Sequence, residues 1–223
     1  ICWINKKETR MAMQDNENIK KLLIITGPQG SGNHLWSKMF SMHPNVVGWP
    51  MFRKEWQGHH KEPFNEYWQQ PEKLQEFDTD DKNYFVTSIS CPYYKDKEPH
   101  VPKYAEFIDE AKKKFDSVVV CIIGRDRDIL NMQQTRVCKS HTTPIALEQF
   151  DKLADTKFIS TELLFLYGEQ YLKSLVTVLD FPVAWNHATL LKDYLKENTN
   201  KRYLTEPDKG GFDDEVEKAC AES

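Results

Sequence analysis

Short apolar runs along the chain alternate with segments in which apolar residues recur at helical spacing. Runs of strand length occupy residues 20–26, 46–47, 84–90, 117–123 and 157–161. Segments of helical period occupy residues 35–42, 104–115, 128–137, 144–153, 167–179 and 186–196. Because strands that alternate with helices pair in parallel, the pattern predicts a three-layer α/β domain with a central, mostly parallel sheet flanked by helices.

The pattern also divides the chain into three parts. Residues 1–19 are polar and contain no apolar segment of signal-peptide type, so we expect an N-terminal extension outside the fold. Residues 20–205 are expected to form a single domain, in keeping with a length of 223 residues, and residues 206–223 an acidic tail. Residues 49–82 show little periodicity and are predicted to form a long excursion with one helix near residues 71–77.

Composition narrows the function classes. With 30 Lys and Arg against 34 Asp and Glu, the net charge of −4 argues against a protein that coats nucleic acid. No run approaches the roughly 18 consecutive apolar residues of a membrane span. The 5 cysteines lie far apart without zinc-ligand spacing, which favours reduced thiols, a cytoplasmic protein and no metal site.

The sequence GPQGSGNH, residues 27–34, stands between the first predicted strand and the first predicted helix. Its glycines allow a tight turn whose N–H groups face inward at a helix N-terminus, a geometry that binds anions, although a plain tight turn is the alternative. The predicted anion-binding residues are Gly27, Gln29, Gly30, Ser31, Gly32, Asn33 and His34. Asn33 and His34 stand where a triphosphate-binding loop has Lys and then Ser or Thr, so the usual groups for the γ-phosphate and Mg²⁺ are missing.

A second candidate feature follows the apolar run at residues 117–123. Arg125 leaves the carboxyl end of this predicted strand, and the carboxyl ends of parallel strands share one edge of the sheet. We therefore expect its guanidinium beside the glycine loop; a salt bridge to Asp128 is the alternative interpretation. Asn131 and Gln133, on the helix that follows, are alternative second donors to the same phosphate.

These two features together resemble the sulfotransferases that use 3′-phosphoadenosine 5′-phosphosulfate (PAPS). In that family a P-loop-like turn after the first strand holds the 5′-phosphosulfate, and an arginine segment after a later strand holds the 3′-phosphate. Residues 42–47, 53–56 and 158–163 resemble further landmarks in the same order, and residues 53–56 match the KE element of the carbohydrate and tyrosyl-protein branches. The resemblance implies a P-loop-type fold, PAPS as donor, 3′,5′-bisphosphoadenosine (PAP) as product and no metal.

The resemblance also implies catalytic roles. Glu55, in the KE element, matches the base that removes the acceptor's proton, and burial by neighbouring aromatic side chains would raise its pKa. Gly30 stands at the position of the family's loop lysine, and Ser90 at that of a histidine base. A cation for the departing phosphate must then come from elsewhere, and His34 and Lys54 are the candidates nearest in sequence.

The predicted function is transfer of a sulfuryl group from PAPS to a hydroxyl or amine of a carbohydrate or small-molecule acceptor. Neither nucleic acid nor a membrane is an expected partner. Two alternatives stay open. A P-loop nucleotide kinase or hydrolase would need ATP and Mg²⁺, and an inactive nucleotide-binding module would keep the fold without the chemistry, as Gly30 and Ser90 suggest.

Overall fold

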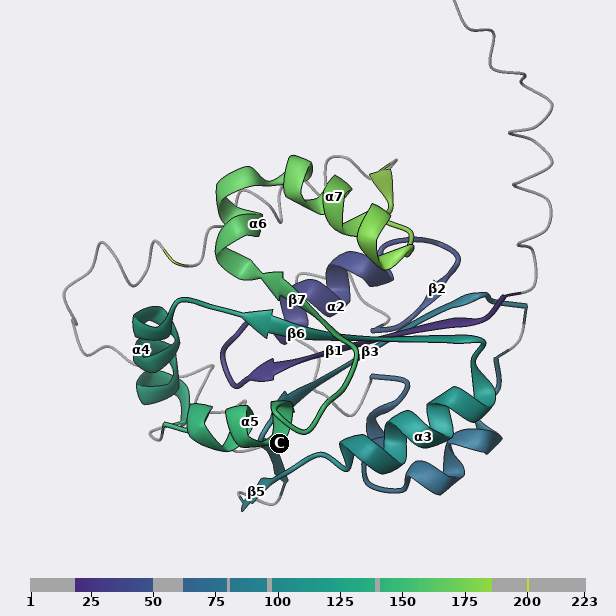
Figure 1. Ribbon diagram of the computed structural model, residues 1–223, viewed down its shortest axis with the longest axis horizontal. Coiled ribbons are helices and arrows are strands. Elements are labelled where there is room, and N and C mark those ends of the chain that lie inside the picture. The colour runs from purple at the N-terminus through teal and green to yellow at the C-terminus, as the bar shows by residue number, and fades with distance from the viewer. Residues whose placement is uncertain are drawn as a thin grey trace, which may run out of the picture.

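The computed structural model describes residues 19–49, 62–79, 81–95, 98–138, 141–185 and 200. At its centre lies a 5-stranded sheet in the order β2-β3-β1-β6-β7 (Figure 1). The strands are β1 (Lys21–Pro28), β2 (Val46–Val47), β3 (Tyr84–Cys91), β6 (Ser117–Gly124) and β7 (Thr156–Ser160). Every neighbouring pair is parallel, so the predicted α/β class with a parallel sheet is confirmed.

Helices cover both faces of the sheet (Figure 1). One face carries α2 (Asn33–Ser41), α6 (Thr161–Tyr167) and α7 (Glu169–Leu179). The other carries α3 (Tyr104–Lys114), α5 (Thr143–Phe150) and the 3-10 helices η2 (Asn65–Trp68) and η3 (Pro71–Glu76). A separate antiparallel hairpin joins β4 (Tyr93–Lys95) and β5 (Glu98–His100).

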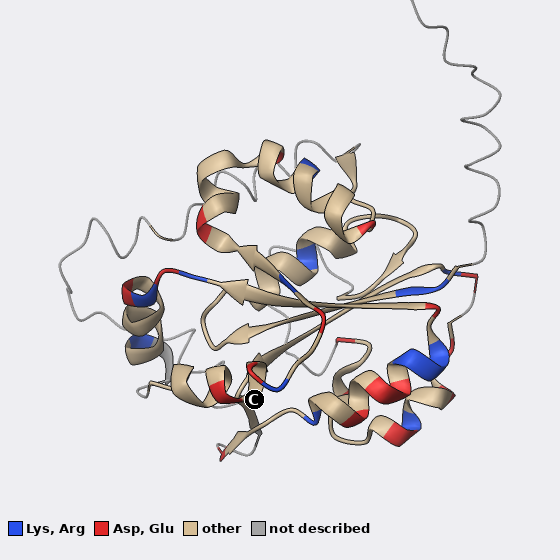
Figure 2. Cartoon of the chain, in the orientation of Figure 1, with Lys and Arg blue, Asp and Glu red and all other residues tan. Residues whose placement is uncertain are grey.

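The central strand shows why the sheet is buried on both sides. In β1, Leu22 and Ile24 point into a core shared with α3, whereas Leu23 and Ile25 point into a second core shared with α2 and α7. Successive side chains of a strand face opposite ways, so a strand covered on both faces must be apolar throughout. Figure 2 accordingly shows the sheet mostly tan, with charged residues prominent on α3.

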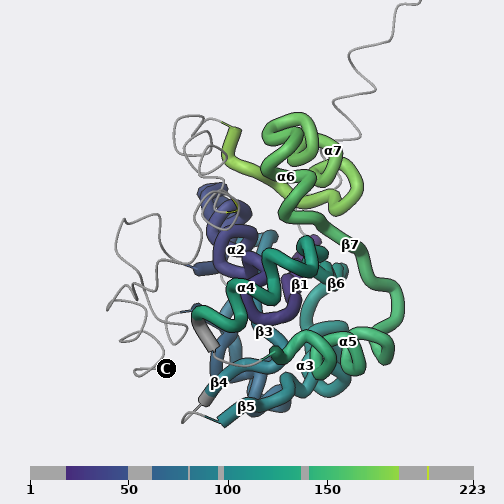
Figure 3. Tube along the Cα trace, turned by 90° about the vertical axis from the view of Figure 1, so that its left-hand side faces the viewer, coloured from purple at the N-terminus to yellow at the C-terminus, as the bar shows by residue number. Residues whose placement is uncertain are grey.

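The order of the strands places a topological switch point at the carboxyl ends of β1 and β6. From β1 the chain passes through α2 to β2, on one side of β1, whereas from β6 it passes to β7 on the other side. Where neighbouring parallel strands connect in opposite directions, their carboxyl ends leave a crevice in which α/β proteins bind ligands. α4 (Arg127–Cys138) stands beyond this edge, in front of the ends of β1 and β6 in Figure 3.

Some predicted boundaries differ from those in the structure. The helix predicted over residues 167–179 is α7, which begins two residues later, at Glu169, because Gly168, with φ 51°, separates it from α6. The helix α6 itself was not predicted from its periodicity. Ser160 caps α6 by accepting a hydrogen bond from the N–H of Leu163 at 3.2 Å, a start signal that periodicity misses. β1 runs through Pro28, so the loop predicted over residues 27–34 is shorter and α2 already begins at Asn33.

Other predictions fall partly or wholly outside the described residues. The helix predicted near residues 71–77 is the 3-10 helix η3. The helix predicted over residues 186–196 lies outside the described residues, as do residues 1–18 and 206–223, so the predicted three-part division of the chain stays a prediction. Within the described ranges, no helix is both long and apolar enough to cross a membrane.

Candidate functional site

The turn between β1 and α2 consists of residues 29–32. Gly30 and Gly32 have φ values of 81° and 107°, in the left-handed region that residues with a Cβ disfavour. Gly32 is the N-cap residue of α2, and no side chain in the described part of the chain caps the helix there. Because the first N–H groups of a helix have no acceptor within it, this end of α2 offers donors to an anion.

Three successive carbonyls of the turn each accept a hydrogen bond from a side chain that lies far from the turn in sequence. The donor–carbonyl pairs are Gln134 with Gln29 at 2.8 Å, Arg125 with Gly30, and Thr161 with Ser31 at 2.9 Å. In a trans peptide the C=O and the following N–H point in opposite directions. The N–H of Gly30 therefore points away from Gln134, and the N–H of Gly32 points away from Thr161.

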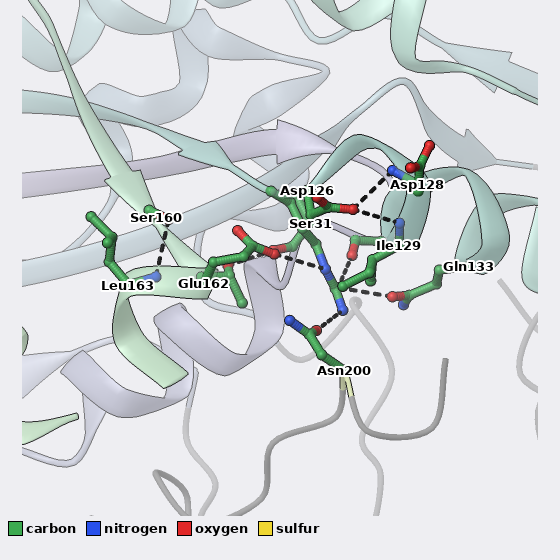
Figure 4. Close-up of polar contacts among 12 residues, drawn as sticks. Ser31, Asp126, Asp128, Ile129, Gln133, Ser160, Glu162, Leu163 and Asn200 are labelled. Carbon is green, nitrogen blue, oxygen red and sulfur yellow. Dashed lines mark hydrogen bonds and ion pairs between the residues drawn. The ribbon is translucent and has the colours of Figure 1, made fainter. Parts of the chain in front are cut away.

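Arg125 lies beside the turn, with its side chain only 3% exposed. Besides the carbonyl of Gly30, its guanidinium donates to Gln133 Oε1 at 2.8 Å and to Asn200 Oδ1 at 2.9 Å. Its Nε lies 3.9 Å from Glu162 Oε1. Figure 4 shows Gln133, Glu162 and Asn200 converging on this point. The structure thus places Arg125 with the loop, as expected from the sequence, while its role as a phosphate ligand stays a prediction.

The first turn of α4 is fixed by its own cap. Asp126 Oδ1 accepts hydrogen bonds from the N–H groups of Asp128 and Ile129, both at 3.0 Å. Such a cap satisfies N–H groups that have no acceptor within the helix. The carboxylate of Asp128 is exposed on this turn, and the ion pair that the structure shows for Arg125 is the one with Glu162.

The two alternative phosphate donors on α4 lie in different surroundings. Gln133 bonds to Arg125 and covers Gly30, because a Cβ placed on that glycine would meet Gln133 Cδ at 3.1 Å. The contact that the structure shows for Asn131 runs through its carbonyl, which accepts from Thr135 Oγ1 at 2.9 Å. Of the two, Gln133 is the residue that the structure brings to the loop.

Buried side chains form the base of the loop. Asn33 Nδ2 donates to Ser90 Oγ at 2.9 Å and so ties the first residue of α2 to the carboxyl end of β3. Ser31 is fully buried, and its side chain fills the space that a Cβ on Gly27 would take. Gln29 Oε1 accepts a hydrogen bond from Thr142 Oγ1 at 3.3 Å. All of these residues hold the loop in place.

Of the two candidate cations, His34 lies in the first turn of α2. The ring of His34 is packed against Trp49, with the centroids 4.7 Å apart and the planes tilted by 58°. One turn further along, Lys38 Nζ lies 5.6 Å from the Trp49 ring, and burial lowers the pKa of this lysine. His34 and Lys38 therefore both lie against the ring of Trp49. Lys54 and Glu55 lie outside the described residues.

Several residues at the site were not predicted from the sequence. They are Gln134, Thr161, Glu162 as the partner of Arg125, and Asn200. A glutamine inside a helix and a threonine after a strand carry no periodic signal. The one available signal was position, since Thr161 directly follows a parallel strand and so lies at the same edge of the sheet as the loop.

The sequence analysis also missed a buried carboxyl beside β3. Glu62 is 4% exposed, and its Oε2 accepts a hydrogen bond from the N–H of Phe64 at 3.0 Å. Burial raises the pKa of Glu62 to about 8, although hydrogen bonds with Thr87 and with the backbone of Phe64 and Ser88 oppose this shift. Burial therefore favours the protonated form of this carboxyl.

Comparison with known proteins finds distant structural similarity and no related sequence. The sequence matches no family model, and no curated protein matches it. A solved sugar kinase from a Janibacter species is 12% identical, with a TM-score of 0.39 over 73% of this chain and 95% of that chain. A mouse sulfotransferase solved in complex with PAP is 9% identical, with a TM-score of 0.43 over 92% of this chain and 73% of that chain. The chain's own geometry, a strand, glycine turn and helix on a parallel sheet, is a P-loop-type arrangement.

Proposed function

We propose that this chain binds PAPS at the turn after β1 and transfers its sulfuryl group to a hydroxyl or amine acceptor, without a metal ion. One observation carries the proposal. The side chains of Gln134, Arg125 and Thr161 hold three loop carbonyls, which turns the N–H groups of Gly30 and Gly32 away from Gln134 and Thr161, next to the start of α2, where no side chain in the described part of the chain caps the helix. N–H groups at such a turn and helix start stabilise an anionic phosphate and the charge that grows on it during transfer.

The proposed reaction breaks one bond and forms one. The S–O bond between the sulfuryl group and the 5′-phosphate breaks, the acceptor oxygen or nitrogen bonds to sulfur, and PAP leaves with the bridging oxygen. The acceptor's proton passes to a base, for which Glu55 is the proposed residue. The loop supplies positioning and anion stabilisation, and His34, at the start of α2, is the proposed donor to the departing phosphate.

The donor set favours PAPS over a nucleoside triphosphate. A triphosphate site uses a lysine and a hydroxyl directly after the last loop glycine. Here Asn33 and His34 follow Gly32, and they bond to Ser90 and pack on Trp49 respectively. The neighbouring strand β3 ends in Ser90 and Cys91, so the carboxylate that would hold Mg²⁺ is replaced by a hydroxyl and a thiol. These residues fit a donor that needs no metal.

The test compares the binding of PAP with that of ATP, each in the presence of Mg²⁺ and in the presence of EDTA. Binding is measured by thermal unfolding and by calorimetry. PAP should stabilise the folded chain equally with and without Mg²⁺, by about 2.7 kcal/mol at a concentration 100 times its Kd. Stabilisation by ATP that requires Mg²⁺, together with no response to PAP, would overturn the proposal in favour of a kinase or hydrolase.

The proposed base has its own test. Glu55→Gln keeps the shape of the side chain and removes the proton acceptor, so PAP binding should persist while sulfuryl transfer falls about 100-fold or more. Glu72→Gln, an exposed glutamate of η3, is the matched control and should leave both unchanged. Undiminished transfer by Glu55→Gln would rule this residue out as the base.

A further inference from the structure

Gln134 connects the loop to the start of α5. Its side chain is fully buried, at 0% exposure of the residue. Its Nε2 donates to the carbonyl of Gln29 at 2.8 Å, while its Oε1 accepts from the N–H of Thr142 at 3.0 Å and from Thr143 Oγ1 at 3.2 Å. Both ends of the amide are therefore occupied, and its orientation is fixed.

Thr161 connects the loop to the start of α6 in the same way. The residue is 1% exposed. Its Oγ1 donates to the carbonyl of Ser31 at 2.9 Å and lies 3.2 Å from Trp36 Nε1, the donor of a second hydrogen bond. It also packs over Gly32, where an added Cβ would approach the same Oγ1 to 3.3 Å. The hydroxyl hydrogen is thereby directed at the loop.

A loop with glycines at positions 30 and 32 needs such contacts to keep one peptide orientation. Glycine crosses between positive and negative φ at little cost, so the peptides around Gly30 and Gly32 can flip and turn their N–H groups outward. A flip of the peptide after Gln29 or after Ser31 would bury the amide of Gln134 or the hydroxyl of Thr161 without its acceptor. Burying an unpaired donor costs more than an ordinary hydrogen bond gains.

We infer that Gln134 and Thr161 are positioning residues of the anion site: by holding the carbonyls of Gln29 and Ser31, they aim the N–H groups of Gly30 and Gly32 at the bound phosphate. The inference rests on the proposed function. It assigns to two uncharged, buried side chains a part of the affinity that the sequence attributes to the loop and Arg125. Neither side chain touches the ligand in this arrangement.

The experiment measures PAP affinity by calorimetry for Gln134→Met and Thr161→Val, two changes that keep volume and remove the donor. Each should weaken PAP binding about tenfold, whereas Thr161→Ser, which keeps the hydroxyl, should bind within about twofold of the parent chain. Thr87→Val is the matched control, because Thr87 is also fully buried and its Oγ1 accepts from Trp68 Nε1 at 3.1 Å, away from the loop. It should lower the melting temperature as Thr161→Val does but leave PAP affinity unchanged.

The outcomes separate this inference from the proposed function. If the parent chain binds no PAP, the proposed function fails. If it binds PAP and both variants bind within twofold of it, the positioning role is wrong while the proposed function stands.

A second measurement uses the parent chain alone and so does not depend on whether the variants fold. PAP should shift and protect the amide NMR signals of Gly30 and Gly32 more than that of Ser31, because the Ser31 N–H already donates to Pro28 O at 3.0 Å. Unshifted Gly30 and Gly32 signals in saturated complex would overturn the inference.

Discussion

Arg125 stabilises the loop through a guanidinium that serves several acceptors at once. Its planar fork reaches the carbonyl of Gly30, Gln133 and Asn200, and Glu162 lies beside it. This geometry explains an arginine here rather than a lysine, because only a guanidinium presents several fixed donors to separate acceptors. A phosphate bound in the crevice would share these donors with the protein.

Arg125→Ala should therefore lower both stability and affinity. The loss of charge-assisted hydrogen bonds is expected to weaken PAP binding by about 1–3 kcal/mol and to lower the melting temperature. Arg127→Ala, at an exposed position two residues along, is the control and should change neither. Calorimetry with PAP and a thermal melt check both expectations. A larger loss of PAP affinity in Arg127→Ala than in Arg125→Ala would show that Arg127, and not Arg125, contacts the phosphate.

Glu62 predicts a pH dependence of stability. Its pKa is raised to about 8 in the folded chain from an ordinary value of 4.5, so the folded state holds the proton more tightly than the unfolded state. The stability that this proton confers is fully present below about pH 4.5 and is lost as pH rises to 8, at up to about 1.4 kcal/mol per pH unit. Glu62→Gln should flatten this slope in urea unfolding at pH 5, 6.5 and 8. An equal slope in both chains would contradict the raised pKa.

At the scale of elements, the apolar runs of β1 and β6 were predictable because a strand covered on both faces has to be apolar. The short helix α6 was not, since its start depends on a cap at Ser160 and its end on Gly168, neither of which periodicity detects. The β4–β5 hairpin was missed for a related reason. Its strands have only 3 residues each, too few for an alternation to appear.

Two glycines at helix ends allow backbone strain to be separated from function. Gly32 and Gly168 both have positive φ, at 107° and 51°, but a Cβ at Gly32 would crowd Thr161 at 3.3 Å whereas nothing lies within 4 Å of one at Gly168. Gly32→Ala and Gly168→Ala should each lower the free energy of unfolding by about 1–3 kcal/mol. Only Gly32→Ala should also weaken PAP binding. Equal affinity in the two variants would mean that the turn does not bind the phosphate.

At the scale of the whole molecule, the shared edge of the sheet was predictable and the contacts at that edge were not. Segments that follow two parallel strands both begin at the carboxyl edge of the sheet. For this reason Arg125 could be assigned to the loop from the sequence. Gln134 contacts the loop, and Asn200 contacts Arg125, from positions that no strand end specifies. Glu55 stays a prediction from the sequence resemblance, because it lies outside the described residues.

These long-range contacts predict how PAP should affect the molecule as a whole. The loop is bonded to α4 and the start of α5 through Gln134, and to α6 through Thr161. A ligand that stabilises the loop should therefore slow hydrogen exchange beyond it, because segments joined by buried hydrogen bonds open together.

Exchange measured by mass spectrometry at saturating PAP should slow in β1, α2, α4 and the first turns of α5 and α6. The β4–β5 hairpin, a separate two-stranded sheet, is the internal reference and should exchange at the same rate with and without PAP. Protection confined to residues 29–34 would show that the loop opens independently of α5 and α6, and that its contacts with Gln134 and Thr161 do not couple these elements.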